Sequence, residues 1–200
     1  DSTYQLYYHK IGDIQSKDQL VFDTSNTKSN FSFFTKQNKL FIVETSEDET
    51  TKNYYYSTIE NESFQFKNFI KDDKSNLELL NIINDKFYFS DEKYSWGNIS
   101  YFDINNRTEN TILIPQVYSH LLVGATFLEN YIICKYDNMG KYYMSIHDYT
   151  GKFIRKFEAP HNMDFQIRFY DEKTNELFVT FYSYTISSLN YKLNITTGAN

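Results

Sequence analysis

The stretch KYYMSIHDYTGKFIRKF, residues 141–157, has the pattern of a strand, a tight turn and a second strand. Within residues 142–147 apolar and more polar side chains alternate, which is the two-residue period of a strand. Asp148, Thr150 and Gly151 then supply residue types that make turns, and an apolar run begins again after them. One hairpin of this kind is common in proteins, so the fold depends on whether the pattern recurs.

The same order of segments occurs four times along the chain, before and after this hairpin. Each unit begins with polar turn residues and continues as an apolar, aromatic run: NKLFIVE (38–44), DKFYFSD (85–91), ENYIICKY (129–136) and NELFVTF (175–181). A strand that ends in a turn rich in Asn, Asp or Gly follows each run: YYYSTIENE (54–62), ISYFDINNR (99–107), MSIHDYTGK (144–152) and NYKLNITTGAN (190–200). The runs start 47, 44 and 46 residues apart, and other short strands fit between these landmarks.

Four short strands in a unit of about 46 residues are typical of a β-propeller blade. A β-sandwich also contains many short strands, but it does not repeat at a fixed interval. The stretch SNLELLNIIND (75–85) also has apolar residues at helical spacing, and its place in the repeat favours a strand. Gly (6) and Pro (2) are scarce, so we expect Asn, Asp, Ser and Lys to form most turns. The sequence therefore predicts an all-β protein built from blades of four antiparallel strands.

The repeat divides the 200 residues into one β-propeller segment with incomplete blades at both ends. We expect a partial blade at 4–23, complete blades at 24–70, 71–114 and 115–160, and a partial blade at 161–200. Two arrangements stay open. Either the chain is an incomplete arc of a larger propeller, or residues 18–23 complete the last blade and close a five-bladed propeller. An arc leaves sheet edges unpaired, and such edges favour self-association.

The charge and the apolar runs of the sequence exclude several classes of partner. The formal net charge is −6 and no basic face stands out, so we expect no nucleic-acid partner. No apolar run approaches the roughly 18 residues of a membrane span, so we expect no membrane association. The start of the chain lacks the organisation of a signal peptide, which favours a cytoplasmic protein. The single cysteine, Cys134, lies in an apolar run and is expected to be a buried structural thiol.

No motif for catalysis, nucleotide binding or metal binding occurs in the sequence. The nucleophile elbow Gly-x-Ser-x-Gly, the P-loop, the dinucleotide fingerprint and the His-Glu-x-x-His motif are all absent. His147 beside Asp148 looks catalytic, but His9 occupies the equivalent repeat position, which favours a structural role for both histidines. The segment KYDNMGK (135–141) has too few carboxylates for a calcium loop. We therefore expect no catalytic residue, cofactor or metal in this chain.

The most acidic short segment, SEDETTKN (46–53), is the candidate site. It lies in the loop expected between the second and third strands of a blade, and it contains Glu47, Asp48, Glu49 and Thr50. One interpretation is an ordinary solvated loop. The other is a group of carboxylates at the mouth of a propeller, which attracts cationic peptides through long-range electrostatics.

A family resemblance begins at residues 7–23. The stretch YYHKIGDIQSKDQLVFD resembles part of the propeller of the prolyl oligopeptidase family, with a Tyr-rich strand, a polar step and a short apolar strand in the same order. Further similar segments follow in the family's order: KLFIVETSEDETTKNYYYS (39–57), TILIPQ (111–116), NYIICKYDNMGKYYMSIHDYTGKFIRKFEAP (130–160) and NELFVTFYSYTISSLNYKLNITTG (175–198). Members usually carry a proline shortly after the Ser/Thr cluster of the last segment, whereas this chain has Ile186, Ser187 and Ser188 there.

The resemblance implies an incomplete arc of a seven-bladed propeller from a serine-type endopeptidase, of the prolyl oligopeptidase or the oligopeptidase B branch. These branches cleave after Pro and after Lys or Arg, respectively. In the family a Ser-Asp-His triad lies in an α/β-hydrolase domain, and the propeller admits only short peptides to it. The triad motifs are absent here, so the resemblance implies a gating segment that is inactive alone, with a peptidase domain after Asn200 or in another chain. It also implies that Glu47–Thr50 face the central cavity, close to the substrate.

Two other functions stay open. A stand-alone propeller acts as a binding or scaffold module, and a closed five-bladed ring is the structure that favours this function. A small propeller glycosidase needs two or three carboxylates that converge in the central channel, and no sequence feature selects such a set.

Overall fold

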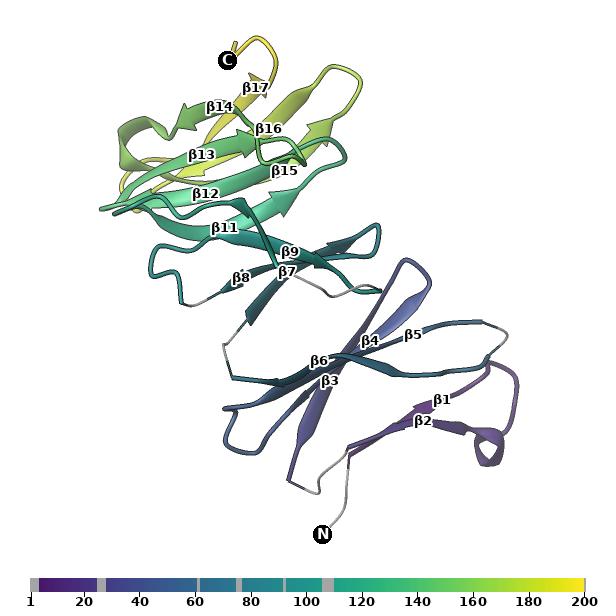
Figure 1. The fold of residues 1–200 in the computed structure, drawn as a ribbon. Coiled ribbons are helices and arrows are strands. Elements are labelled where there is room, and N and C mark those ends of the chain that lie inside the picture. The colour runs from purple at the N-terminus through teal and green to yellow at the C-terminus, as the bar shows by residue number, and fades with distance from the viewer. Residues whose placement is uncertain are drawn as a thin grey trace. The chain divides into compact units, whose positions relative to one another are not determined.

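The computed structural model describes residues 4–24, 28–60, 62–74, 77–91, 93–105 and 110–199 (Figure 1). Within these ranges the chain consists of β-strands joined by short turns and loops. Two short 3₁₀ turns, η1 (Gln15–Lys17) and η2 (Pro160–Asn162), are the only helical elements in the same ranges. The prediction of an all-β protein is therefore confirmed.

The described strands form antiparallel sheets in which neighbours follow their order along the chain. The first sheet has two strands, β1 (Gln5–Tyr8) and β2 (Gln19–Asp23). The second contains β3 (Asn30–Lys36), β4 (Lys39–Thr45), β5 (Lys52–Thr58) and β6 (Lys67–Asp73). The third contains β7 (Leu77–Ile83), β8 (Lys86–Asp91), β9 (Ile99–Asp103) and β10 (Thr111–Ile114). The fourth contains β11 (Leu121–Phe127), β12 (Ile132–Asn138), β13 (Lys141–His147) and β14 (Phe153–Glu158). The last contains β15 (Asp164–Asp171), β16 (Glu176–Tyr182) and β17 (Leu189–Asn194).

This succession of four-stranded meanders is a partial β-propeller, as the repeat predicted. Residues 77–83, which also had helical spacing, form strand β7, so the strand interpretation is confirmed. Within the described residues no sheet closes on itself, and β2 is hydrogen-bonded to β1 alone.

The fourth strand of the second sheet starts later than its apolar pattern suggests. The pattern begins at Phe64, but β6 runs from Lys67 to Asp73 and crosses the expected blade limit at residue 70. The backbone N–H of Gln65 donates to the hydroxyl of Ser57 at 2.8 Å, so this part of the chain bonds to a side chain instead of joining the ladder. The blade limits themselves stay a prediction.

Tight hairpins in this chain do not always need glycine, because two of the three turns described next contain none. Both central residues have positive φ in the turns Gln37–Asn38 (48° and 57°), Asn84–Asp85 (48° and 60°) and Met139–Gly140 (52° and 81°). Positive φ at both positions is the type I′ geometry, whose twist matches that of the flanking strands. Asn and Asp tolerate this conformation better than other residues with a side chain, which explains how so few glycines suffice.

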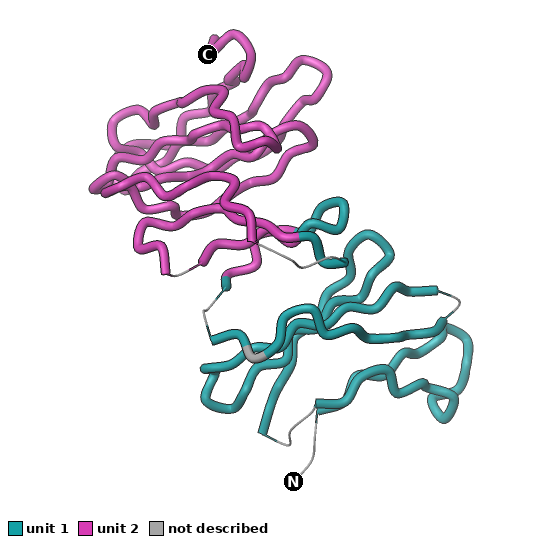
Figure 2. Tube along the Cα trace, in the orientation of Figure 1, with its two compact units in different colours: residues 1–77, 82–86, 103–108 teal, residues 78–81, 87–102, 109–200 magenta. Residues whose placement is uncertain are grey.

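The chain divides into two compact units, which Figure 2 shows in different colours. The first comprises residues 1–77, 82–86 and 103–108, and the second comprises residues 78–81, 87–102 and 109–200. In the first unit, buried side chains of β4, β5 and β6 form the interior: Leu40, Phe41, Ile42, Tyr54, Tyr56 and Ile70. In the second unit, one buried cluster joins the fourth and last sheets: Ile133, Met144, Ile146, Met163, Phe165, Leu177, Val179, Phe181, Leu193 and Ile195. Burial of one such side chain stabilises the fold by about 1.5–3 kcal/mol.

Two further expectations from the sequence concern the cysteine and the membrane. Cys134 on β12 is fully buried, as predicted, and burial raises the pKa of its thiol to about 12. Within the described ranges no helix has the length and apolar character needed to cross a membrane.

Candidate functional site

The candidate loop connects β4 to β5, the second and third strands of its sheet, which is the position expected from the repeat. The predicted residues Glu47, Asp48, Glu49 and Thr50 lie together in this loop and are exposed. Their exposure allows contact with a ligand, and their proximity to a substrate stays a prediction.

The carboxylate of Asp48 organises the loop from within. Its Oδ1 accepts hydrogen bonds from the hydroxyls of Ser46 (2.6 Å) and Thr50 (2.9 Å) and from the backbone N–H of Thr50 (3.2 Å). These bonds favour the ionised form and lower the pKa of Asp48. The backbone N–H of Ser46 donates to the carbonyl of Thr51 at 3.0 Å and closes the loop. Asp48 therefore acts as an internal brace of the loop.

Glu47 and Glu49 are the carboxylates that the loop presents to solvent. Glu47 Oε2 lies 3.4 Å from Lys28 Nζ, and both side chains are well exposed. Exposed ion pairs of this kind are weak, so Lys28 offsets the charge of Glu47 only in part. Glu49 has φ 57°, a left-handed conformation at the tip of the turn. Glu47 and Glu49 can therefore attract a cation, while Asp48 holds the loop that carries them.

A buried carboxylate lies on the strand that leads into the loop. Glu44 on β4 is 1% exposed, and its Oε2 accepts hydrogen bonds from Tyr55 Oη (3.0 Å) and Asn53 Nδ2 (3.4 Å) on β5. A buried charge needs such partners because it loses its hydration. Glu44 thus ties β4 to β5 immediately before the candidate loop, a role that the sequence interpretation missed.

Asp91 occupies the equivalent place at the end of β8. It is 3% exposed, its Oδ2 lies 2.7 Å from Lys93 Nζ, and its backbone N–H donates to Asn98 Oδ1 at 3.1 Å. The signal for both residues was present in the repeat, because Glu44 and Asp91 each close an aligned apolar run. Two blades therefore carry a buried carboxylate at the entrance to the loop between their second and third strands.

His147 forms a pair with Ser145 that has the separation of a nucleophile and its base. Ser145 Oγ lies 2.8 Å from His147 Nε2, and His147 Nδ1 lies 3.2 Å from the carbonyl oxygen of Gly151. A carbonyl only accepts, so Nδ1 carries the proton of the neutral ring and Nε2 accepts from the serine hydroxyl. Both side chains are buried, at 7% and 9% exposure, and burial lowers the pKa of His147. This pair therefore braces the β13–β14 hairpin, which supports the structural interpretation.

The carboxylate of Asp148 forms its hydrogen bonds within its own turn and not with this pair. It accepts hydrogen bonds from the hydroxyl of Thr150 (2.6 Å) and from the backbone of Lys152 (3.1 Å). His9, at the equivalent repeat position, instead lies 2.6 Å from Asp18 and is about half exposed. The two histidines thus occupy equivalent positions in the repeat, but their side chains contact different partners.

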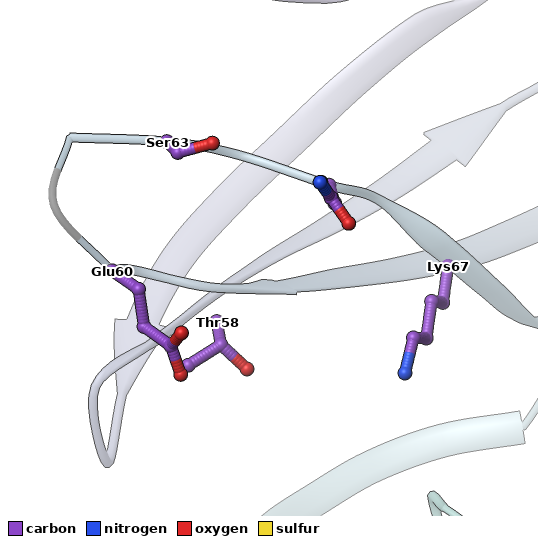
Figure 3. A pocket seen from close by; sticks show the side chains of 5 residues that line it. Thr58, Glu60, Ser63 and Lys67 are labelled. Atoms are coloured by element: carbon purple, nitrogen blue, oxygen red, sulfur yellow. The ribbon is translucent and has the colours of Figure 1, made fainter.

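A hollow of about 350 Å³ lies at the β5–β6 connection and was not predicted. It is lined by Thr58, Glu60, Ser63, Gln65 and Lys67. Figure 3 shows Thr58 and Glu60 on one side of the hollow and Lys67 across from them. The two sides of the hollow come together because Glu60 and Ser63 form an isolated antiparallel β-bridge. No pattern in the sequence predicts such a single bridge.

Metal binding has no support in the described part of the chain. Within those residues, no group of three or more His, Cys, Asp or Glu side chains is placed to hold an ion.

Solved structures of similar fold are peptidases with longer chains. A prolyl endopeptidase matches with a TM-score of 0.75 and 17% identity, over 98% of this chain and 29% of its own. Prolyl oligopeptidase B from Galerina marginata matches with a TM-score of 0.72 and 12% identity, over 98% of this chain and 29% of its own. Oligopeptidase B from Trypanosoma brucei matches with a TM-score of 0.70 and 13% identity, over 98% of this chain and 30% of its own. This chain thus spans about 30% of their length, and the likeness shows a shared fold.

The family assignment comes from sequence. No curated protein sequence matches the chain. The model of the prolyl oligopeptidase N-terminal β-propeller domain matches residues 1–200. The match covers every sheet described above and includes the segments that resemble the family. The chain therefore belongs to the prolyl oligopeptidase family, as part of its N-terminal β-propeller domain.

Proposed function

We propose that this chain is the non-catalytic, access-restricting propeller segment of a prolyl oligopeptidase-family endopeptidase. An α/β-hydrolase domain, in the same chain or in another, carries the active site, and the propeller lets only short peptides reach it. The observation that carries this proposal is the family match over residues 1–200 in a sequence without a serine nucleophile motif. Both branches, which cleave after Pro or after Lys and Arg, stay within the proposal.

The candidate loop has the properties needed to meet a peptide. Its exposed carboxylates, Glu47 and Glu49, stand on a loop that Asp48 holds in one conformation. A held loop loses little conformational freedom when a ligand binds, which favours binding. We infer that these two carboxylates draw cationic peptides toward the propeller.

Size selection is the property that tests the proposal. A peptidase domain of this family is assayed with a short and a long fluorogenic peptide that share one cleavage sequence, with and without the chain added. We expect the added chain to slow cleavage of the long peptide and to leave that of the short peptide nearly unchanged. The same assay with the chain unfolded by heat is the control. Equal slowing of both peptides, or of neither, contradicts the proposal.

A further inference from the structure

Two adjoining hollows, here together called the tyrosine groove, lie within the second unit. One part, of about 360 Å³, is lined by Tyr142, Asn162, Asp164, Tyr182, Ser183 and Tyr184. The other part, of about 250 Å³, shares Tyr142 and Asn162 and adds Asn138, Lys141, Lys156 and Glu158. The two parts share the side chains of Tyr142 and Asn162 and therefore lie next to each other. Together they reach the volume of sites for small ligands, about 300–1,000 Å³.

The walls of the tyrosine groove are fixed by contacts within the protein. Tyr182 Oη donates to Asp164 Oδ2 at 3.0 Å. Lys135 forms an ion pair with Asp164, and its Nζ lies 5.2 Å from the centre of the Tyr142 ring. The charge of Asp164 is therefore balanced inside the protein, and the rings of Tyr142 and Tyr182 are held in place before a ligand arrives.

Two ammonium groups stand at the other part of the groove. Lys156 Nζ lies 4.3 Å from the centre of the Tyr143 ring and 2.8 Å from Glu158 Oε1. The side chain of Glu158 is 75% exposed, so its attraction for Lys156 is screened by water. Lys141 is also exposed and, after Lys156, helps to lower the pKa of Glu158, so two ammonium groups lie close to one carboxylate. This part of the groove thus has the charge to receive an anionic group.

The balance of charges favours a ligand with a single negative charge. Glu158 and Asp164 line the groove, and Asp137 lies close enough to Tyr142 to raise its pKa, after the effect of burial. Lys141 and Lys156 together carry one more charge than Glu158 beside them, which matches a ligand carboxylate with its single negative charge.

The rest of the groove suits a peptide. Tyr184 has a fully exposed ring, and Tyr182 is 40% exposed, so both offer apolar surface to a side chain of the ligand. The amide of Asn162 and the hydroxyl of Ser183 can hydrogen-bond to a peptide backbone.

We propose that the tyrosine groove binds a short peptide by its free C-terminal carboxylate, which lies between Lys141 and Lys156, while the peptide's side chains contact Tyr182 and Tyr184. This accessory site goes beyond the gating proposed above. It lies outside the candidate loop, and its test needs only the chain itself.

The test compares a short peptide with a free C-terminus and the same peptide with a C-terminal amide. Binding to the full chain is measured by isothermal titration calorimetry. We expect the amide to bind about tenfold more weakly or worse, because it cannot form charge-assisted hydrogen bonds. The double variant Lys141→Gln/Lys156→Gln should bind the free acid as weakly as the amide. Lys173→Gln, which changes an exposed lysine outside the groove, should bind like the unchanged chain.

Tyr184→Ala separates the ring contact from the charge contact. We expect this variant to bind both peptides more weakly and to keep the preference for the free acid. Thermal unfolding of each variant shows that it is folded. Equal affinity for acid and amide, insensitivity to the lysine substitutions, or tighter binding of inorganic phosphate than of the peptide would each overturn the proposal.

Discussion

At the scale of single residues, hydrogen bonds decide which polar groups brace the fold and which face a ligand. Ser145 and His147 have the separation of a catalytic pair, but both are buried and bonded within one hairpin. Asp48 is exposed, but its carboxylate is engaged within its own loop. Glu47 and Glu49 are the carboxylates of that loop that stay exposed to solvent and can attract an approaching cationic peptide.

Buried His147 should make stability depend on pH. Its folded-state pKa is lowered by burial from an ordinary value of 6.5, so the unfolded chain binds the proton more readily. The stability from this group is complete above that ordinary value and is lost as the pH falls from it through the lowered folded-state pKa. We expect His147→Gln, which does not titrate, to lose less stability than the unchanged chain between neutral and mildly acidic pH. Urea unfolding at the two pH values measures this, and equal losses would contradict the assignment.

The charge of the candidate loop should control how fast cationic peptides associate with the chain. We expect Glu47→Gln/Glu49→Gln to slow association of a Lys-rich peptide at low salt by a factor of about 10 or less, because electrostatic steering weakens. Stopped-flow fluorescence measures the rate. Glu78→Gln, on the exposed side of β7, is the matched control and should have little effect. If the two variants slow association equally, the loop has no special role.

At the scale of elements, the sequence predicted strands well because the pattern of each strand is local. The four apolar runs form β4, β8, β12 and β16, and the polar residues before them precede these strands. The apolar pattern from Phe64 does not show that β6 begins only at Lys67, because the backbone N–H of Gln65 donates to the hydroxyl of Ser57 instead of joining the ladder. Glu44 closes an aligned apolar run, but its hydrogen bonds to Tyr55 and Asn53 lie across the sheet, where a strand pattern does not show them.

The core between the fourth and last sheets should carry much of the stability of the second unit. Leu177 on β16 is fully buried there. We expect Leu177→Ala to lower the free energy of unfolding by about 2–5 kcal/mol, because it removes buried methyl groups and leaves a cavity. Urea unfolding measures the change. Val123→Ala, at a position that is 48% exposed, should change it by about 0.5 kcal/mol or less. Similar effects of the two substitutions would contradict this packing.

The β12–β13 turn offers a test of the turn geometry. Met139 has φ 52° and is 90% exposed. Its left-handed conformation costs free energy, and no burial of its side chain offsets that cost. We expect Met139→Asn to raise the free energy of unfolding by up to about 1 kcal/mol, because Asn-Gly is the preferred type I′ pair. A shift of the thermal midpoint upward supports this geometry, and a shift downward contradicts it.

At the scale of the whole molecule, the sequence repeat predicted propeller blades. The family match then showed that they belong to the N-terminal β-propeller domain of the prolyl oligopeptidase family. The tyrosine groove could not be predicted, because its walls come from residues 138–142, 156–164 and 182–184, which only the packed sheets bring together. The active site that this propeller is proposed to serve requires a nucleophile, a base and oxyanion donors, which the chain's motifs do not supply.

Hydrolysis by the purified chain is the most direct test of the central claim that this is a non-catalytic propeller segment. The chain is incubated with fluorogenic peptides that carry Pro or Arg before the reporter group, and a peptidase domain of the family serves as the positive control. We predict no turnover above the rate in buffer for either peptide. Turnover that a serine-directed inhibitor abolishes would contradict the claim, because it would place a working nucleophile within these 200 residues.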